Sequence, residues 1–329
     1  MNRSLELPPW SGIALILALA GFIALAIRSV RKTGGIKRSF FSSPYTLWMI
    51  VFTIVPCILV AYYALTDSSG SFSFDNFINF WDSNYTVNQM YTEMGEPYTQ
   101  LIQRGMVNID ILVYSLWMAL LCTLICLAIG YPAAFFMADK DMKIGATIVV
   151  LFIIPMWMNF LLRTVAWMTL LEDQGLINNI LRSLGFSGVH LMYNNGAVLL
   201  GMVYNFLPFM VFPIYTSLNK MDGKLMEAAQ DLGANPTRTF LRVTLPLSLP
   251  GVISGITMVF MPSVTTFFIP RILGGGNTMM FGDLIENTFL TENNWGVGSA
   301  LSLVMMVLIL LSLSILRKAD PEGEGGGMI

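Results

Sequence analysis

Few side chains in this 329-residue sequence have the types needed for covalent or metal chemistry. The sequence contains one histidine, His190, and three cysteines, Cys57, Cys122 and Cys126, all within apolar runs. Cys122 and Cys126 share a helix face, but neither a second ligand pair nor a histidine lies near them. We therefore expect the cysteines to be small buried hydrophobic residues, and we predict no catalytic residue and no metal site.

The composition indicates that much of the exterior contacts a solvent other than water. Hydrophobic residues make up 55% of the sequence and charged residues 12%, whereas a soluble domain carries about 25% charged residues. A helix of about 20 apolar residues crosses the hydrocarbon core. We therefore predict an all-α polytopic membrane protein whose spans lie at 11–27, 45–66, 110–137, 146–170, 196–218, 247–271 and 296–316.

Lysine and arginine are concentrated on one side of the alternating loops. Thirteen of them follow the first, third, fifth and seventh spans, within 28–38, 140–143, 220–242 and 317–318. The opposite side holds only Arg3, Arg104, Arg182 and Arg271, and its segments are rich in acidic residues. Because basic loops stay in the cytoplasm, we expect the N-terminus outside and the C-terminus in the cytoplasm.

The cytoplasmic loop after the fifth span has strong local signals for a bent pair of helices. Asp222 is a plausible N-cap for a short helix, and Gly233 stands where a left-handed residue would end that helix. Asn235-Pro236 then starts a turn into a second helix. An apolar face of Leu225, Ala228, Ala229 and Leu232 is too small to form a core by itself. We expect that face to dock against a partner protein.

The same loop resembles the EAA loop of ABC importer permeases. Glu227-Ala228-Ala229, then Gly233 after three residues, and Val243-Thr244-Leu245-Pro246 after nine more meet that pattern at every position. Over roughly 45–316 the sequence is similar to the B-type permease subunit of spermidine/putrescine importers. The further matching segments are Tyr114–Leu116, Gly130–Phe136, Ile154–Trp157, Asn205–Met210, Leu273–Asn277 and Asn294–Trp295.

The resemblance implies a six-helix type I ABC importer permease core at 45–316. Residues 1–44 would add an N-terminal transmembrane helix and a basic linker, and 317–329 a cytoplasmic tail. The loop at 222–246 would be the coupling helix that seats in a cytoplasmic ATPase. Its coupling residues would be Glu227, Ala228, Ala229, Asp231, Gly233, Leu245 and Pro246.

The resemblance also implies the partners. They are a second, C-type permease subunit, two copies of the ATPase, an extracytoplasmic binding protein and the bacterial inner membrane. The chain would hold no cofactor, because ATP and Mg would bind to the ATPase, and nothing indicates nucleic acid. Iron, sulfate or amino-acid-like cargo stays an alternative within transport. A membrane enzyme or scaffold is the alternative from another class. The lack of histidines and of a paired carboxylate motif within the spans disfavours an enzyme, and the spacing of Glu227 and Gly233 disfavours a scaffold.

A polyamine pathway would need carboxylates for the ammonium groups and aromatic faces for cation–π and methylene contacts. The candidates near outer span ends are Trp157, Tyr204, Glu172, Asp173, Asp283 and Glu286. Asp283 and Glu286 are spaced to share one helix face. Alternatively, the aromatic residues belong to an interfacial belt and the carboxylates are solvated loop charges. Arg163 is the one charge within a span. It is expected to act as a gate, to pair with an outer carboxylate such as Glu172, or to reach the headgroups.

Overall fold

The computed structural model describes residues 45, 48–67, 70–81, 90–91, 97–98, 107–139, 145–276 and 278–319. Within them, four helical stretches are long and apolar enough to cross a membrane: Asn108–Met137, Asn195–Asn219, Pro236–Thr265 and Trp295–Ile315. The predicted spans at 110–137, 196–218 and 296–316 are therefore confirmed. The predicted span at 11–27 lies outside the described residues.

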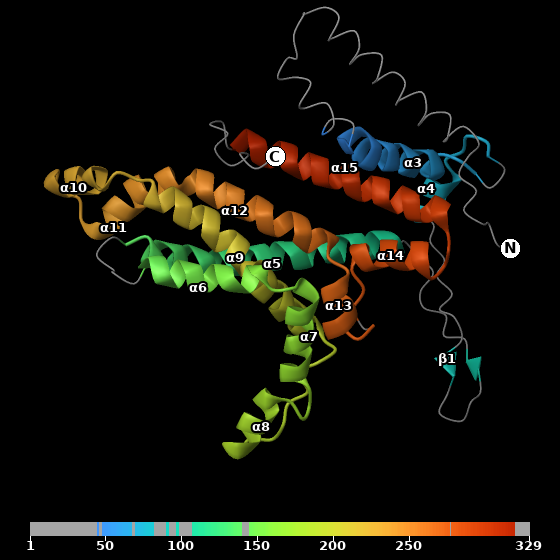
Figure 1. The fold of residues 1–329 in the computed structure, drawn as a ribbon, viewed down its shortest axis with the longest axis horizontal. Coiled ribbons are helices and arrows are strands. Elements are labelled where there is room, and N and C mark those ends of the chain that lie inside the picture. Colours follow the sequence, from blue (N-terminus) through green and yellow to red (C-terminus); the bar gives the residue numbers. More distant parts are fainter. Residues whose placement is uncertain are drawn as a thin grey trace, which may run out of the picture.

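The long helices run side by side along the longest axis of the molecule (Figure 1). They are α5 (Val107–Met137), α9 (Asn195–Asn219), α12 (Leu245–Thr265) and α15 (Trp295–Ala319). The predicted span at 45–66 contains a shorter apolar helix, Ile50–Ala64. It is made of the π-helical segment η1 (Ile50–Ile54) and of α3 (Val55–Ala64), which packs on α15.

Short elements connect the long helices. Beyond α3 come α4 (Asp75–Trp81) and an antiparallel pair of two-residue strands, β1 (Met90–Tyr91) and β2 (Pro97–Tyr98). Between α12 and α15 lie α13 (Phe268–Leu273) and α14 (Phe281–Leu290). Apart from this strand pair, the described chain is helical or irregular, which confirms the all-α prediction.

The prediction of one continuous span at 146–170 is wrong. That segment forms two helices, α6 (Gly145–Trp157) and α7 (Phe160–Leu171), which are followed by α8 (Leu176–Ser183). Pro155 weakens the end of α6 because it has no N–H to donate. The Asn159 side chain then accepts a 2.8 Å hydrogen bond from the Leu161 N–H and starts a new helix. Figure 1 shows α7 and α8 turning away from the bundle.

The predicted span at 247–271 has the wrong bounds. The helical stretch begins at Pro236 and ends at Thr265. It ends there because the backbone of Thr266 is extended (ψ 136°), and α13 follows as a separate helix. The stretch contains a second π-helical segment, η2 (Phe240–Thr244), directly before Leu245-Pro246. The segment η1 likewise stands directly before Val55-Pro56. A proline cannot donate to the carbonyl four residues earlier, which favours a wider turn at that point.

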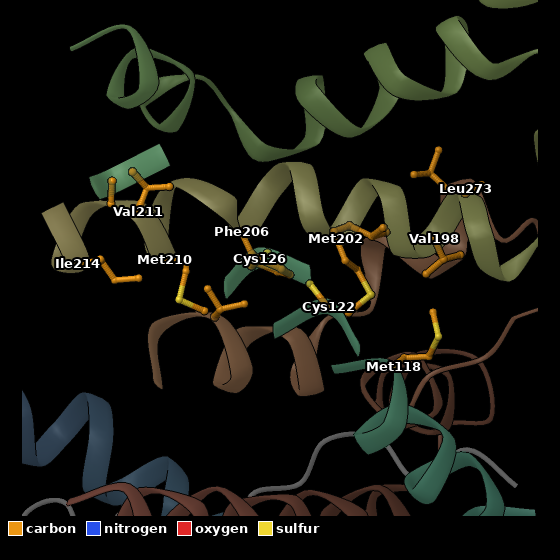
Figure 2. Close-up of a cluster of buried hydrophobic side chains, with 14 of the residues drawn as sticks. Met118, Cys122, Cys126, Val198, Met202, Phe206, Met210, Val211, Ile214 and Leu273 are labelled. Atoms are coloured by element: carbon orange, nitrogen blue, oxygen red, sulfur yellow. The ribbon is translucent and has the colours of Figure 1, made fainter. Parts of the chain in front are cut away.

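The core forms around α9. In the most apolar window of this helix 56% of residues are buried, against 28% in α15. Figure 2 shows Cys122 and Cys126 of α5 among the α9 side chains Met202, Phe206 and Met210. Both cysteines are fully buried, as predicted. The prediction is wrong for Cys57, which is exposed on α3.

Candidate coupling site and outer-face cation site

A helical hairpin extends beyond the bundle at one end of the molecule (Figure 1). The N-cap of its first helix, α10 (Gly223–Asp231), is Asp222. The Asp222 carboxylate accepts a 3.1 Å hydrogen bond from the Lys224 N–H. The helix ends in a Schellman motif. The Gly233 N–H donates to the Gln230 carbonyl at 2.8 Å, and the Ala234 N–H donates to the Ala229 carbonyl at 3.0 Å. Gly233 has φ +84°, the left-handed conformation that this turn requires and that glycine adopts without steric strain.

The second helix of the hairpin leads directly into the membrane stretch. Asn235 caps α11 (Pro236–Thr239) by accepting a 2.8 Å hydrogen bond from the Arg238 N–H. The helical stretch then continues through η2 into α12 without a break. We use the name coupling hairpin for residues 222–246. The predicted cap, bend and turn of this hairpin are confirmed.

The outward face of α10 has no partner within the described chain. None of its residues is buried. Leu232 at its end is 89% exposed and Leu225 48% exposed. Glu227 and Ala228 are exposed, and Ala229 is half-buried. An apolar strip with a carboxylate on it is therefore presented at the end of the bundle.

Aromatic contacts attach the coupling hairpin to α5, and a hydroxyl contact joins α5 to the following helix α12. The Phe240 ring packs edge-on against the rings of Tyr131 and Phe135, with centroids 5.9 and 5.5 Å away. The Tyr131 hydroxyl lies 2.9 Å from the Ser248 hydroxyl of α12 in a hydrogen bond. These four residues were not identified as functional from the sequence, although Tyr131 and Phe135 lie in a matching segment.

Close backbone approach joins the same region to α9. A Cβ added at Gly251 of α12 would lie 2.5 Å from the Ser217 Cβ and 2.7 Å from the Pro213 carbonyl oxygen. Any side chain at this position would therefore push the two helices apart. The region that follows the hairpin is therefore joined to α9 through contacts with little free space.

At the other end, a charged cluster spans α13 and α14. The Arg271 guanidinium forms a 2.7 Å ion pair with the Glu286 carboxylate. Asp283 is half-buried on the same helix as Glu286. Burial raises the pKa of the Asp283 carboxyl above its ordinary value, Arg271 lowers this pKa and Glu286 raises it. The expected pair of carboxylates is present, and Arg271, which was not foreseen as their partner, already neutralises one of them.

The other predicted pathway residues lie in separate elements. Trp157 ends α6 and is 89% exposed. Tyr204 on α9 packs edge-on against Trp167 of α7, with ring centroids 5.2 Å apart. Glu172 and Asp173 are exposed after α7, and Asp173 pairs with His190 at 3.0 Å. Among these predicted pathway residues, only Asp283 and Glu286 share one helix.

Arg163 lies one turn into α7 and is 6% exposed. Its Nε and Nη1 atoms are buried without a hydrogen-bond partner among the described residues. No ion pair joins Arg163 to Glu172 among the described residues, so that expected pairing is absent. The Tyr204 phenol is near enough to interact with the guanidinium electrostatically.

One protein family matches most of the membrane region and the coupling hairpin. Residues 130–322 match the family described as "Binding-protein-dependent transport system inner membrane component". The chain belongs to this family. The permease is therefore a multi-pass inner-membrane transport component and not an enzyme.

Individual relatives agree with the family match. The permease is 34% identical to the "Spermidine/putrescine transport system permease protein PotB" of Haemophilus influenzae, over 83% of this chain and 90% of that protein. It is 33% identical to the Escherichia coli protein of the same name, over 83% and 94%. The Escherichia coli "Inner membrane ABC transporter permease protein YdcU" is 27% identical, over 72% and 81%.

A solved structure shares the fold. A chain of "a bacterial ABC transporter involved in the import of the acidic polysaccharide alginate" superposes with a TM-score of 0.66 at 16% identity, over 84% of the permease and 93% of that chain. At this identity the likeness shows the fold alone. The permease therefore has the architecture of an ABC importer subunit, and its cargo must be argued from other observations.

Proposed function

We propose that the permease forms half of the translocation pathway of a polyamine importer and couples it to a cytoplasmic ATPase through the coupling hairpin. A second, C-type permease would complete the pathway. Two ATPase copies would bind ATP and Mg, and an extracytoplasmic protein would deliver the cargo. The N-terminus lies outside and the C-terminus in the cytoplasm in this arrangement, with the coupling hairpin on the cytoplasmic side.

The exposed α10 face is the observation that carries the coupling role. Leu225, Ala228 and Leu232 form an apolar strip that nothing in the described chain covers. Glu227 beside this strip supplies a polar contact, and the small Ala228 and Ala229 allow close approach. Asp231 adds a second exposed carboxylate, and Leu245 and Pro246 join the hairpin to α12. An ATPase cleft that holds α10 would therefore move α12 directly when the ATPases close.

Two observations support a polyamine cargo. The two most similar relatives reported above carry the name of spermidine/putrescine permeases. In addition, Asp283 and Glu286 together outnumber Arg271 in the outer cluster, which leaves one negative charge toward a cationic cargo. Trp157 and the Tyr204 ring would supply aromatic surface for methylene groups. Glu172 and Asp173 would add negative charge farther along the outer face.

Co-purification tests the coupling role. The complete transporter is purified with the native chain, with Glu227→Ala and with Gln230→Ala, an exposed control on the same helix. We expect Glu227→Ala to lower both ATPase retention and cargo-stimulated ATP hydrolysis, and Gln230→Ala to change neither. Equal ATPase retention in all three preparations would show that Glu227 and the α10 face around it do not bind the ATPase.

Cargo is tested with the reconstituted transporter and its external binding protein. We expect spermidine or putrescine to stimulate ATP hydrolysis and to be taken up, and sulfate, ferric iron and amino acids to do neither. Stimulation by one of the latter and not by polyamines would overturn the cargo assignment and leave the coupling role intact.

A further inference from the structure

The helix that carries Asp283 and Glu286 has no capping side chain of its own. It is α14, whose N-cap residue Met280 makes no side-chain hydrogen bond to the helix. The first N–H groups of a helix have no partner inside that helix, and a buried N–H group is costly to leave unpaired. The partner of the first N–H group of α14 must therefore come from elsewhere in the chain.

Ser115 of α5 supplies that partner from 166 residues away in the sequence. Its hydroxyl oxygen accepts a 2.7 Å hydrogen bond from the Phe281 N–H, and its hydroxyl group donates to the Ile111 carbonyl at 2.7 Å. Ser115 and Phe281 are both 0% exposed. A hydroxyl group that can donate and accept at once thus caps α14 from a neighbouring helix.

Further contacts hold the first turn of α14 in the same place. The Phe281 ring packs edge-on against the Phe80 ring of α4, with centroids 6.4 Å apart. A Cβ added at Gly282 would overlap the Thr265 carbonyl oxygen and would lie 2.9 Å from the Thr266 carbonyl oxygen. The first turn therefore contacts α4, α5 and the end of α12, and it has little room to shift.

The rotation of α14 about its own axis determines where its carboxylates point. Phe281, Leu284 and Thr288 are fully buried and recur at spacings of three and four, so they form the buried side of the helix. Asp283 and Glu286 are half-buried. Each stands two residues after a buried one, which is about 200° around the helix. The contacts of the first turn therefore set the direction of both carboxylates.

Ordinary helix packing is the alternative explanation for Ser115. Serine and threonine within helices often donate to the carbonyl four residues earlier. Ser115 does so to Ile111, and Thr123 on the same helix does so to Ala119 at 2.7 Å. Ser115 differs in that it also accepts a hydrogen bond from another helix, which Thr123 does not do among the described residues. This second bond is what links Ser115 to α14.

We propose that Ser115 is a positioning residue for the cargo, because by holding the start of α14 it directs Asp283 and Glu286 toward the ammonium groups of a polyamine. This rests on the proposed function, since it takes the two carboxylates to meet the cargo. Ser115 is fully buried and does not touch the cargo. It acts through the placement of α14.

Removal of the Ser115 hydroxyl group tests this placement in the complete reconstituted transporter. We expect Ser115→Ala to lower spermidine uptake by about tenfold at a saturating concentration of the loaded binding protein, because small displacements of binding groups have effects of this size. ATPase retention should stay native, since the coupling hairpin lies at the opposite end of the bundle (Figure 1). Native uptake by Ser115→Ala would overturn the proposal.

Thr123→Val is the matched control on α5. It removes a buried hydroxyl group that donates within the helix in the same way but makes no bond to α14. We expect uptake and ATPase retention to stay native. A loss as large as that of Ser115→Ala would show that any buried hydroxyl group of α5 has this effect, and would overturn the positioning role.

The same substitution in a transporter without the two carboxylates separates positioning from general stability. Asp283→Asn combined with Glu286→Gln is expected to lower spermidine uptake by itself. Adding Ser115→Ala should then cause no further loss, because groups that act as one unit are not additive. A further loss as large as in the native background would show that Ser115 acts through stability, and would overturn the proposal.

Infrared titration of the Asp283 carboxyl reports the placement of α14 directly. Burial raises the pKa of this carboxyl, so release of the helix from its buried position should move the titration to lower pH. We expect this shift in Ser115→Ala and a native titration in Thr123→Val. A native titration in Ser115→Ala would show that α14 is held without Ser115.

Ser115→Cys provides a second variant in case Ser115→Ala is not recovered in the complex. A thiol is a weaker acceptor at the same position. Uptake is expected to fall while ATPase retention stays native, and native uptake by this variant would likewise contradict the proposal.

Failure of the proposed function gives a different result. If Asp283→Asn with Glu286→Gln leaves spermidine uptake native, the two carboxylates do not meet the cargo, and the proposed cargo site fails together with the positioning role. If that variant lowers uptake and Ser115→Ala does not, only the positioning role fails.

Discussion

The coupling hairpin and a second unit, which consists of α7, α8 and the residues after α8 up to His190 and which we name the arm, are both short helical units that extend from the bundle, but they are built differently. The hairpin is shaped by residues that act on their own backbone: Asp222 and Asn235 cap helices, and Gly233 forms the turn. The arm is shaped by Asn178, whose side chain reaches across 11 residues to Val189. The hairpin is therefore specified by local signals, whereas the arm depends on one contact between separated segments.

This difference predicts how each unit responds to substitution. Loss of a cap or a turn residue weakens one end of a helix and leaves the remainder in place. Loss of a buried side chain with several hydrogen bonds releases every segment that it joins. The same reasoning applies to the charged cluster of α13 and α14, where Arg271 and Glu286 meet across 15 residues.

Asn178→Ala is expected to have the largest effect. It removes three hydrogen bonds, to the Glu172 and Val189 carbonyls and from the Val189 N–H. Each contributes about 1 kcal/mol and their loss leaves buried backbone groups unsatisfied, so the arm should lose about 3 kcal/mol of local stability. Hydrogen exchange of the Val189 amide reports this loss. Asn179→Ala is the matched control, since Asn179 is exposed and donates one hydrogen bond, to the Gln174 carbonyl. Similar exchange rates in both variants would contradict the role given to Asn178.

Gly233→Ala is expected to have a smaller effect on the coupling hairpin. A Cβ at Gly233 meets nothing within 4 Å, so the cost is the left-handed backbone alone, about 1–2 kcal/mol. The Ala234 amide should exchange faster and ATPase stimulation should fall. Gly223→Ala, at the other end of α10 and also in open space, is expected to be neutral or slightly stabilising. If ATPase stimulation fell in Gly223→Ala and not in Gly233→Ala, the role given to the Gly233 turn would be wrong.

Arg271→Gln tests the electrostatics of the charged cluster of α13 and α14. Arg271 lowers the pKa of Asp283, which burial raises, so the variant should shift the Asp283 carboxyl titration to higher pH. Because the folded-state pKa lies above the unfolded value, burial of the charge costs stability at neutral pH, and this cost vanishes as the pH falls below both values. Asp283→Asn should therefore raise the melting temperature more at neutral pH than in acid. Infrared titration of the Asp283 carboxyl checks the shift. An unchanged titration would show that Arg271 does not influence the pKa of Asp283.

The His190–Asp173 pair should contribute least. Both side chains are more than 60% exposed, and exposed ion pairs contribute less than about 1 kcal/mol. His190→Asn is therefore expected to change thermal stability within that range, and to leave Val189 exchange near its native rate. A loss comparable with that of Asn178→Ala would show that the arm depends on this surface pair.

Sequence reasoning succeeded where a residue acts on its neighbours. The cap at Asp222, the turn at Gly233 and the Asn235-Pro236 start were all predicted, and so were the spans with long apolar runs. It failed at the fourth predicted span, because the sequence is apolar on both sides of Met158 and Asn159, whereas the helix is interrupted at these two residues. It also missed Arg271 as the partner of Glu286 and Trp167 as the partner of Tyr204, since such pairs depend on how separate helices pack. The exposure of Cys57 depends on which side of α3 faces α15. The sequence could not predict that side, because α3 is apolar all round.

The π-helical segment at Phe240–Thr244 has a geometric consequence for how the helices on its two sides are oriented. An α-helix turns by about 100° per residue, so the wider turn offsets the angular phase of α11 from that of α12. The direction in which the coupling hairpin points is therefore set at a fixed angular offset from the side of α12 that faces α9. Removal of one residue from this segment would rotate the hairpin by about a quarter turn around the axis and leave the composition of both helices intact.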